Sequence, residues 1–221
     1  MAENRDEQVT GGIVFFGDSV FVGVGANRRT LACTKLVQTK LKLPITVIAR
    51  TGYTSADAIP RLPDVAAEAN HPYVIVQFGN NDCRWISSST SKIPLSNFTD
   101  NLREIIGKIR LYGKIPLLCN LQPIDSEKYA TNDPKIRIFM ANSNTTPYEW
   151  QNRYSEQCNE TAKNLGVALV DIRTKLVEAV KNRIGVIADD GLHPNDLGHN
   201  MIASEILAAL NGLPHIGNAQ E

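Results

Sequence analysis

The sequence predicts an α/β fold in which a parallel β-sheet is covered by helices on both faces. Short runs of β-branched and aromatic residues alternate along the chain with longer segments whose apolar residues recur at helical spacing. Alternating strands and helices are typical of a parallel sheet with helices on either side. A chain of 221 residues is also long enough for one such domain with a full core. We therefore expect a single domain over residues 1–221, with its core at about 12–212.

Five apolar runs are short enough to be buried strands, and turn-forming residues follow them. The runs are Ile13–Phe16, Ile45–Ile48, Tyr73–Phe78, Ile115–Leu121 and Ala168–Asp171. Because right-handed crossovers place the carboxyl ends of parallel strands at one edge of the sheet, we expect the turns after these strands to meet there.

The helical segments lie between these strands. A helix capped by Thr54 or Ser55 and running to about Asn70 is expected to be bent or broken, because Pro60 and Pro63 interrupt it. The other helices are expected at about Leu31–Leu41, Pro94–Tyr112, Pro147–Leu165, Leu176–Asn182 and Asn200–Leu210. The polar stretch Ser87–Lys92 is expected to be a connection.

Charge and cysteine usage exclude several classes of protein. The chain has 23 basic and 23 acidic residues, so no net field favours nucleic acid or an anionic membrane. No stretch approaches the length of a membrane span, and Met1–Thr10 lacks the apolar core of a signal peptide, which predicts a cytoplasmic protein. The cysteines are too scattered for a zinc site or a disulfide framework, and we expect reduced thiols. They are Cys33, Cys83, Cys119 and Cys158.

The first strand ends at Gly17-Asp18-Ser19, where open α/β sheets bind their ligands. A serine at this edge has two interpretations. It is a candidate nucleophile, and it is equally a candidate N-cap of the helix that follows.

A second candidate segment is Asp189–Asn195, in which Asp190 lies three positions before His193. If the segment makes one turn, the carboxylate can hold Nδ1 of the imidazole and leave Nε2 free to take a proton from an alcohol. A capped turn before the last helix, or half of a metal site, would give the same local pattern.

Four segments together resemble the four sequence blocks of the SGNH hydrolases, also called the GDSL esterase/lipase family. They follow the family's order and approximate spacing, and the resemblance covers roughly residues 13–210. The segments are Gly17-Asp18-Ser19-Val20, Gly52, Gly79-Asn80-Asn81-Asp82 and Asp190-Gly191-Leu192-His193-Pro194. The resemblance implies a flavodoxin-like three-layer α/β/α sandwich with a five-stranded parallel sheet. Val20 replaces the family's leucine, which is a conservative apolar change.

The resemblance also implies a role for each matching residue. Ser19 resembles the nucleophile, His193 the general base and Asp190 the residue that orients the base. The oxyanion hole would come from the backbone N–H groups of Ser19 and Gly52 and the side-chain amide of Asn81. A glycine at position 52 lets bare backbone approach closely, and the amide adds a donor without charge.

The implied activity is hydrolysis of carboxylic esters through an acyl-enzyme, with a small-molecule ester as substrate and with no metal or cofactor. A thioesterase or lysophospholipase with the same triad is the alternative among enzymes. From another class, a flavodoxin-like module would bind FMN or phosphate at the same rim, and a catalytically silent sugar-ester binder is a third alternative. Polar residues at Arg50, Thr51, Arg84 and Ser87–Ser89 suggest a wet, open pocket that prefers short acyl groups.

Residues 122–146 are expected to form a long loop, which is unusual in a compact domain. This segment carries the apolar residues Ile136, Ile138, Phe139 and Met140. Three interpretations stay open for them: a lid over an acyl chain, a contact between subunits of a homo-oligomer, or packing on the domain's own core.

The remaining conspicuous side chains have structural interpretations. His71 and His215 are expected at the surface, and His199 is expected to pack or to cap a helix. Asp82 is expected to support the Asn81 turn. Cys83 is interpreted as a spectator thiol rather than a pocket residue, whereas Arg84 and Trp85 are candidates to flank the substrate.

Overall fold

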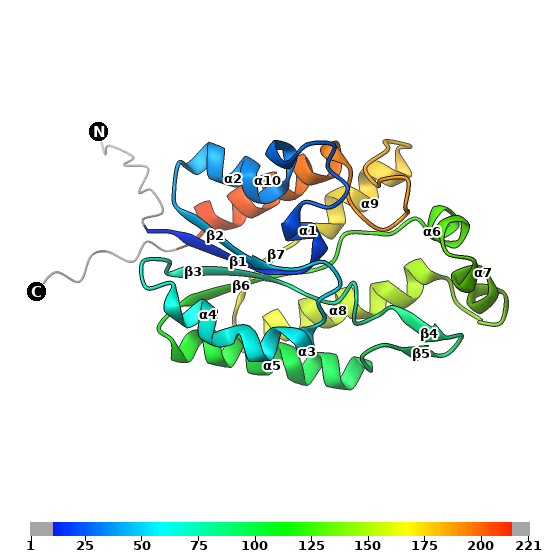
Figure 1. The fold of residues 1–221 in the computed structure, drawn as a ribbon, viewed down its shortest axis with the longest axis horizontal. Helices are drawn as coiled ribbons and strands as arrows, with labels where there is room; N and C mark the ends of the chain where they lie inside the picture. Colours follow the sequence, from blue (N-terminus) through cyan, green and yellow to red (C-terminus); the bar gives the residue numbers. More distant parts are fainter. Residues whose placement is uncertain (1–10, 214–221) are drawn as a thin grey trace, which may run out of the picture.

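The computed structural model describes residues 11–213, and Figure 1 shows a five-stranded sheet between two layers of helices. The strand order is β2-β1-β3-β6-β7, and all four pairings are parallel. Among the sheet strands this is the order 2-1-3-4-5 of flavodoxin-like folds, so the predicted fold class is confirmed. The strands are β1 (Ile13–Gly17), β2 (Ile45–Ala49), β3 (Tyr73–Gln77), β6 (Ile115–Cys119) and β7 (Ala168–Val170).

Successive side chains of a strand point to opposite faces, and each face of the sheet has its own core. Ile13 and Phe15 belong to one apolar cluster, whereas Val14 and Phe16 belong to the other. The first cluster is covered by α1 (Ser19–Val22), α2 (Cys33–Leu41), α9 (Arg173–Lys181) and α10 (Asp196–Asn211). The second is covered by α3 (Ser55–Ala58), α4 (Leu62–Ala67), α5 (Leu95–Leu111) and α8 (Pro147–Leu165).

The predicted helices between the strands are present, and their ends differ from the prediction by a few residues. The segment after Thr54 is broken as expected, with a 3₁₀ turn at Ile59–Arg61 between α3 and α4. Thr54 is its N-cap, accepting a hydrogen bond from the backbone N–H of Asp57. The last helix, α10, begins earlier than expected because the side chain of Asn195 caps it by accepting from the N–H of Gly198.

Residues 122–146 are not a long loop, and that expectation was wrong. They contain two helices, α6 (Ser126–Asn132) and α7 (Pro134–Ala141). Asp125 caps α6 by accepting from two backbone N–H groups, and Asp133 caps α7, where a proline occupies the first turn. Proline is well tolerated at that position because its missing N–H would have no helical partner.

A third apolar cluster joins these two helices to a short hairpin. The hairpin consists of β4 (Trp85–Ser87) and β5 (Thr90–Ser91), in a stretch expected to be irregular. Ile136 of α7 is buried in this cluster, and Phe139 and Met140 pack against it, whereas Ile138 is 59% exposed. Most of the apolar patch therefore packs on the domain itself. A contact between subunits stays a prediction.

Candidate active site

Ser19 lies at the point where β1 gives way to the short helix α1. The chain passes from Gly17 through Asp18, whose side chain caps α1 by accepting a hydrogen bond from the N–H of Val20 (3.0 Å). Ser19 is the first residue of the helix and is 4% exposed. The interpretation of Ser19 as the helix cap is therefore wrong, because Asp18 holds that position.

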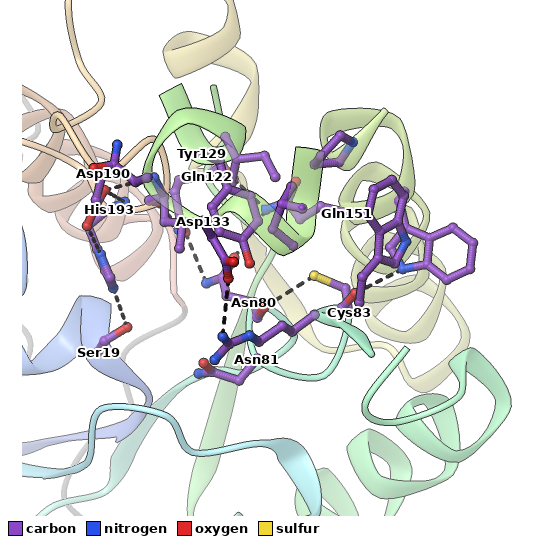
Figure 2. A pocket seen from close by; sticks show the side chains of 18 of the residues that line it. Ser19, Asn80, Asn81, Cys83, Gln122, Tyr129, Asp133, Gln151, Asp190 and His193 are labelled. Carbon is purple, nitrogen blue, oxygen red and sulfur yellow. Dashed lines mark hydrogen bonds and ion pairs between the residues drawn. The ribbon is translucent and has the colours of Figure 1, made fainter. Parts of the chain in front are cut away.

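Ser19, His193 and Asp190 form a continuous chain of hydrogen bonds, which Figure 2 shows at the edge of a cavity. Ser19 Oγ lies 2.9 Å from His193 Nε2, and His193 Nδ1 lies 2.5 Å from Asp190 Oδ2. A carboxylate only accepts hydrogen bonds, so Nδ1 carries the proton and Nε2 is free to accept from the serine hydroxyl.

The one-turn geometry of the segment holds the carboxylate of Asp190 in place. Its Oδ1 accepts from the backbone N–H groups of Leu192 (2.8 Å) and His193 (3.0 Å). Burial alone would raise the pKa of Asp190, but these hydrogen bonds and that of the imidazole outweigh burial and lower it. Asp190 is therefore held ionised, as a partner of an imidazolium must be.

Gly52 and Asn81 line the same cavity as Ser19. Among the described residues, neither the N–H of Ser19 nor that of Gly52 donates to another protein group. Gly52 has a φ of +85°, and a Cβ built there would meet nothing within 4 Å. The positive φ favours glycine at this position, and the space beside its Cα is open. The amide of Asn81 is oriented by a hydrogen bond from Nδ2 to the carbonyl of Tyr53 (2.8 Å).

The cavity has a volume of about 360 Å³, and its walls are more apolar than the sequence suggested. Thr51 and Arg84 line it as expected, but Arg50 stacks against Tyr53 and, with Ser87–Ser89, lies outside the lining. Most of the apolar lining of the cavity comes from the third apolar cluster. The apolar residues that line the cavity include Trp85, Ile124, Ile136, Pro147, Trp150 and Leu192.

Three of the residues after the Asn81 turn also reach the cavity. Arg84 and Trp85 line it, in agreement with their interpretation as flanking residues. Arg84 Nη2 forms an ion pair with Asp133 Oδ2 at 3.6 Å. Cys83 lines the cavity too, which corrects the expectation for this residue. Its thiol donates to the carbonyl of Asn80, and burial raises its pKa well above the ordinary value, so it remains a protonated thiol.

Asp82 and the histidines outside the Ser19 pair have structural contacts. Asp82 is buried and accepts from the N–H and hydroxyl of Ser55, which ties the Asn81 turn to α3. His199 is fully buried between the carbonyl of Val24 and the N–H of Cys33, as the packing interpretation predicted. His71 is not a surface residue, since its side chain is 13% exposed and lies against Glu68. His215 lies outside the described residues.

Two kinds of feature are missing from residues 11–213. This part of the chain holds no group of three or more His, Cys, Asp or Glu side chains arranged to bind a metal ion. Across the same residues, no helix is both long enough and apolar enough to cross a bilayer.

Gly25 supports the site in a way that sequence reasoning missed. Its φ is +94°, and a Cβ there would lie 2.9 Å from Cβ of His193 and collide with the carbonyl oxygen of Pro194. The loop after α1 therefore packs directly against the backbone that carries the imidazole. The two closely spaced glycines, Gly23 and Gly25, were the signal available in the sequence.

Comparison with known proteins gives concordant results. The model of the GDSL-like lipase/acylhydrolase family matches residues 15–201. An isoamyl acetate-hydrolyzing esterase of Saccharomyces cerevisiae is 22% identical over 209 residues, which cover 89% of this chain and 84% of the yeast protein. The crystal structure of a lipase/acylhydrolase from Enterococcus faecalis superposes with a TM-score of 0.69 at 20% identity, covering 91% of this chain and 96% of that one. The acetyl xylan esterase AlAXEase superposes with a TM-score of 0.71 at 23% identity, covering 90% and 98%. Both solved structures share the fold.

Gly25→Ala is expected to lower kcat about 10- to 100-fold, because the added methyl displaces the backbone of His193 and a small misplacement of a reacting group is costly. The measurement is ester hydrolysis by purified protein, with thermal unfolding recorded alongside. Gly107→Ala is the matched control, since a Cβ at this position in α5 meets nothing within 4 Å. Equal kcat for the two variants would contradict the proposed contact between the loop and the histidine.

Proposed function

The chain belongs to the GDSL-like lipase/acylhydrolase family, and on that premise we propose that it is a serine esterase that hydrolyses carboxylic esters of short-chain acids. One observation carries the proposal. Ser19 Oγ, His193 and Asp190 are linked by hydrogen bonds of 2.9 and 2.5 Å beside a cavity large enough for a small ester. This is the arrangement that activates a serine for acyl transfer.

In the proposed reaction, His193 Nε2 takes the hydroxyl proton as Ser19 Oγ attacks the ester carbonyl carbon. The resulting imidazolium is stabilised by Asp190, which also holds the ring in the reactive tautomer. When the tetrahedral intermediate collapses, the same proton passes to the departing alkoxide, and the alcohol leaves an acyl group on Ser19. Water then repeats the cycle, giving the acid and restoring the serine.

The negative charge that develops on the carbonyl oxygen needs hydrogen-bond donors fixed in advance. We assign this role to the N–H groups of Ser19 and Gly52 and to the side-chain amide of Asn81. Loss of one such donor typically raises the barrier by roughly 3 kcal/mol. The support is that all three groups line one cavity and that the two backbone donors have no other acceptor among the described residues.

The chemistry of the substrate is inferred from the relatives and from the cavity wall. Two relatives are named for acetate esters, namely isoamyl acetate and acetyl xylan. The wall of Trp85, Ile136 and Trp150 is apolar and closes the side of the cavity formed by α7 and β4. We therefore propose a short acyl group joined to a small or apolar alcohol. A thioesterase or lysophospholipase would use the same serine but would need room for a long chain.

Ser19→Ala is expected to lower kcat for p-nitrophenyl acetate at least about 10³-fold, because no other side chain replaces the nucleophile. The fold should be unchanged, as judged by circular dichroism and thermal unfolding. Ser96→Ala, an exposed position on α5, is the matched control and should retain full activity. Near-complete turnover by a folded Ser19→Ala protein would contradict the assignment.

Chain-length preference tests the proposed substrate class. Across p-nitrophenyl esters from acetyl to decanoyl, kcat/KM should be highest for the short acyl chains and should have fallen once the chain reaches eight carbons. Ile136→Ala should move the preference toward longer chains, because the wall recedes and each additional buried methylene contributes about 0.8 kcal/mol. Ile138→Ala on the same helix is the control, since that side chain is 59% exposed. A steady rise to decanoyl in the unmodified protein would instead favour the thioesterase or lysophospholipase.

A further inference from the structure

A chain of buried and partly buried hydrogen bonds runs from Arg173, at the start of α9, to Asp18, the residue before Ser19. Arg173 Nη1 donates to Gln151 Oε1 (2.8 Å), and Gln151 Nε2 donates to Asn80 Oδ1 (3.1 Å). Asn80 Nδ2 then donates to Asp18 Oδ2 (3.2 Å). We call these four side chains the amide relay, and two of them, Asn80 and Gln151, are labelled in Figure 2.

Stability gives no account of why a charged group occupies position 173. Arg173 is 7% exposed, and no carboxylate of residues 11–213 forms an ion pair with its guanidinium. Its Nη1 also donates to the backbone carbonyls of Leu121 (3.0 Å) and Gln122 (3.4 Å), whereas Nη2 is buried without a hydrogen-bond partner in residues 11–213. The guanidinium stacks over the ring of Tyr148 at 4.9 Å. Burial of an unpaired cation is costly, and an apolar side chain would avoid that cost.

The two ends of the relay determine the direction of every amide between them. A guanidinium can only donate hydrogen bonds, and a carboxylate can only accept them. Gln151 must therefore turn its oxygen toward Arg173 and its nitrogen toward Asn80. Asn80 must in turn direct its nitrogen at Asp18. Gln151 Nε2 also donates to the backbone carbonyl of Gln122 (2.7 Å), which favours the same direction.

A branch connects the relay to the segment that carries the base. Gln122 Oε1 accepts from Asn80 Nδ2 (3.3 Å), while Gln122 Nε2 donates to the carbonyl of Leu192 (3.2 Å), the neighbour of His193. The relay thus contains Asp18 and Asn80, the sequence neighbours of Ser19 and Asn81. Its branch reaches Leu192, the neighbour of His193. Ser19, Asn81 and His193 are the three positions that the proposed mechanism requires in register.

We propose that Gln151 and Arg173 are positioning residues of this site: by imposing one direction on the buried amides, they hold the Asn80–Asn81 turn and the Leu192–His193 segment in register with Ser19. The proposal rests on the proposed esterase function. Neither side chain hydrogen-bonds to Ser19, Asp190 or His193, although Gln151 lines the cavity, and neither residue lies in the four segments that resemble the family's blocks.

Gln151→Glu tests the direction of the relay with almost no change of shape. The new carboxylate accepts from Arg173 and supplies the missing counter-charge, but it cannot donate to Asn80 Oδ1. Asn80 Oδ1 and the backbone carbonyl of Gln122 each lose their donor and face a carboxylate instead, which disturbs the turn. We expect kcat to fall about 10- to 100-fold while KM stays within about twofold, since positioning acts on the transition state. Thermal stability should stay close to that of the control.

The control is Gln157→Glu, the same change on the same helix, where the side chain hydrogen-bonds to Thr161 alone among residues 11–213. It should leave kcat unchanged. A Gln151→Glu protein with the kcat of this control would overturn the proposal.

A second pair of variants keeps the proposal falsifiable if Gln151→Glu does not fold. Arg173→Lys retains a donor-only cation, whereas Arg173→Gln supplies an amide that can turn either way. Arg173→Lys should therefore retain most of kcat, and Arg173→Gln should lose it by a factor similar to that for Gln151→Glu. Equal kcat in both would overturn the proposal, as would a higher kcat in Arg173→Gln.

Failure of the proposed function would look different. If hydrolysis by the unmodified protein does not depend on Ser19, the esterase assignment fails before any relay variant is made. If hydrolysis depends on Ser19 but is unaffected by Gln151→Glu and by both Arg173 variants, the relay proposal alone fails.

Discussion

The hydrogen bond between Ser19 Oγ and His193 Nε2 joins residues 174 positions apart, and the sheet order makes it possible. β1 lies between β2 and β3, so the turn bearing Ser19 lies between the turn bearing Gly52 and the turn bearing Asn81. Because the strands are parallel, all three turns emerge at one edge. His193 reaches the same edge from the segment before α10, a helix that packs against α2 on one face of the sheet. The sheet topology therefore brings together the side chains that the proposed chemistry requires.

Two buried acids hold these turns in place, and their burial lowers the free energy of unfolding at neutral pH. Asp18 caps the helix of Ser19, and Asp82 ties the Asn81 turn to α3. Burial raises the pKa of each to about 6, although hydrogen bonds partly offset it. The native state then binds these protons more tightly than the unfolded chain, so both contributions to the free energy of unfolding fall as pH rises from about 4 to about 6. Such a cost is consistent with selection for geometry rather than for stability.

Much of this arrangement was predictable because it is encoded locally. Apolar runs ended by glycine marked the strands, and the short spacing of Asp190 and His193 allowed one turn. The helices α6 and α7 were also encoded locally, by the caps Asp125 and Asp133, but both are short and the segment was expected to be a loop. Gly25 and Arg173 were different, because no neighbour in sequence explains them. Gly25 packs against the backbone of His193, and Arg173 donates a hydrogen bond to Gln151. Both contacts exist only in the folded chain.

The central claim is that Ser19 Oγ is the atom that attacks the ester carbonyl carbon. Treating the protein with a p-nitrophenyl phosphonate ester and mapping its peptides by mass spectrometry tests this directly, because the reagent traps the attacking oxygen. The account predicts one phosphonyl group per chain, located on Ser19, with release of nitrophenol and loss of hydrolysis in the same proportion. Modification of another residue with equal loss of activity would contradict it, as would continued hydrolysis by a protein fully modified at Ser19.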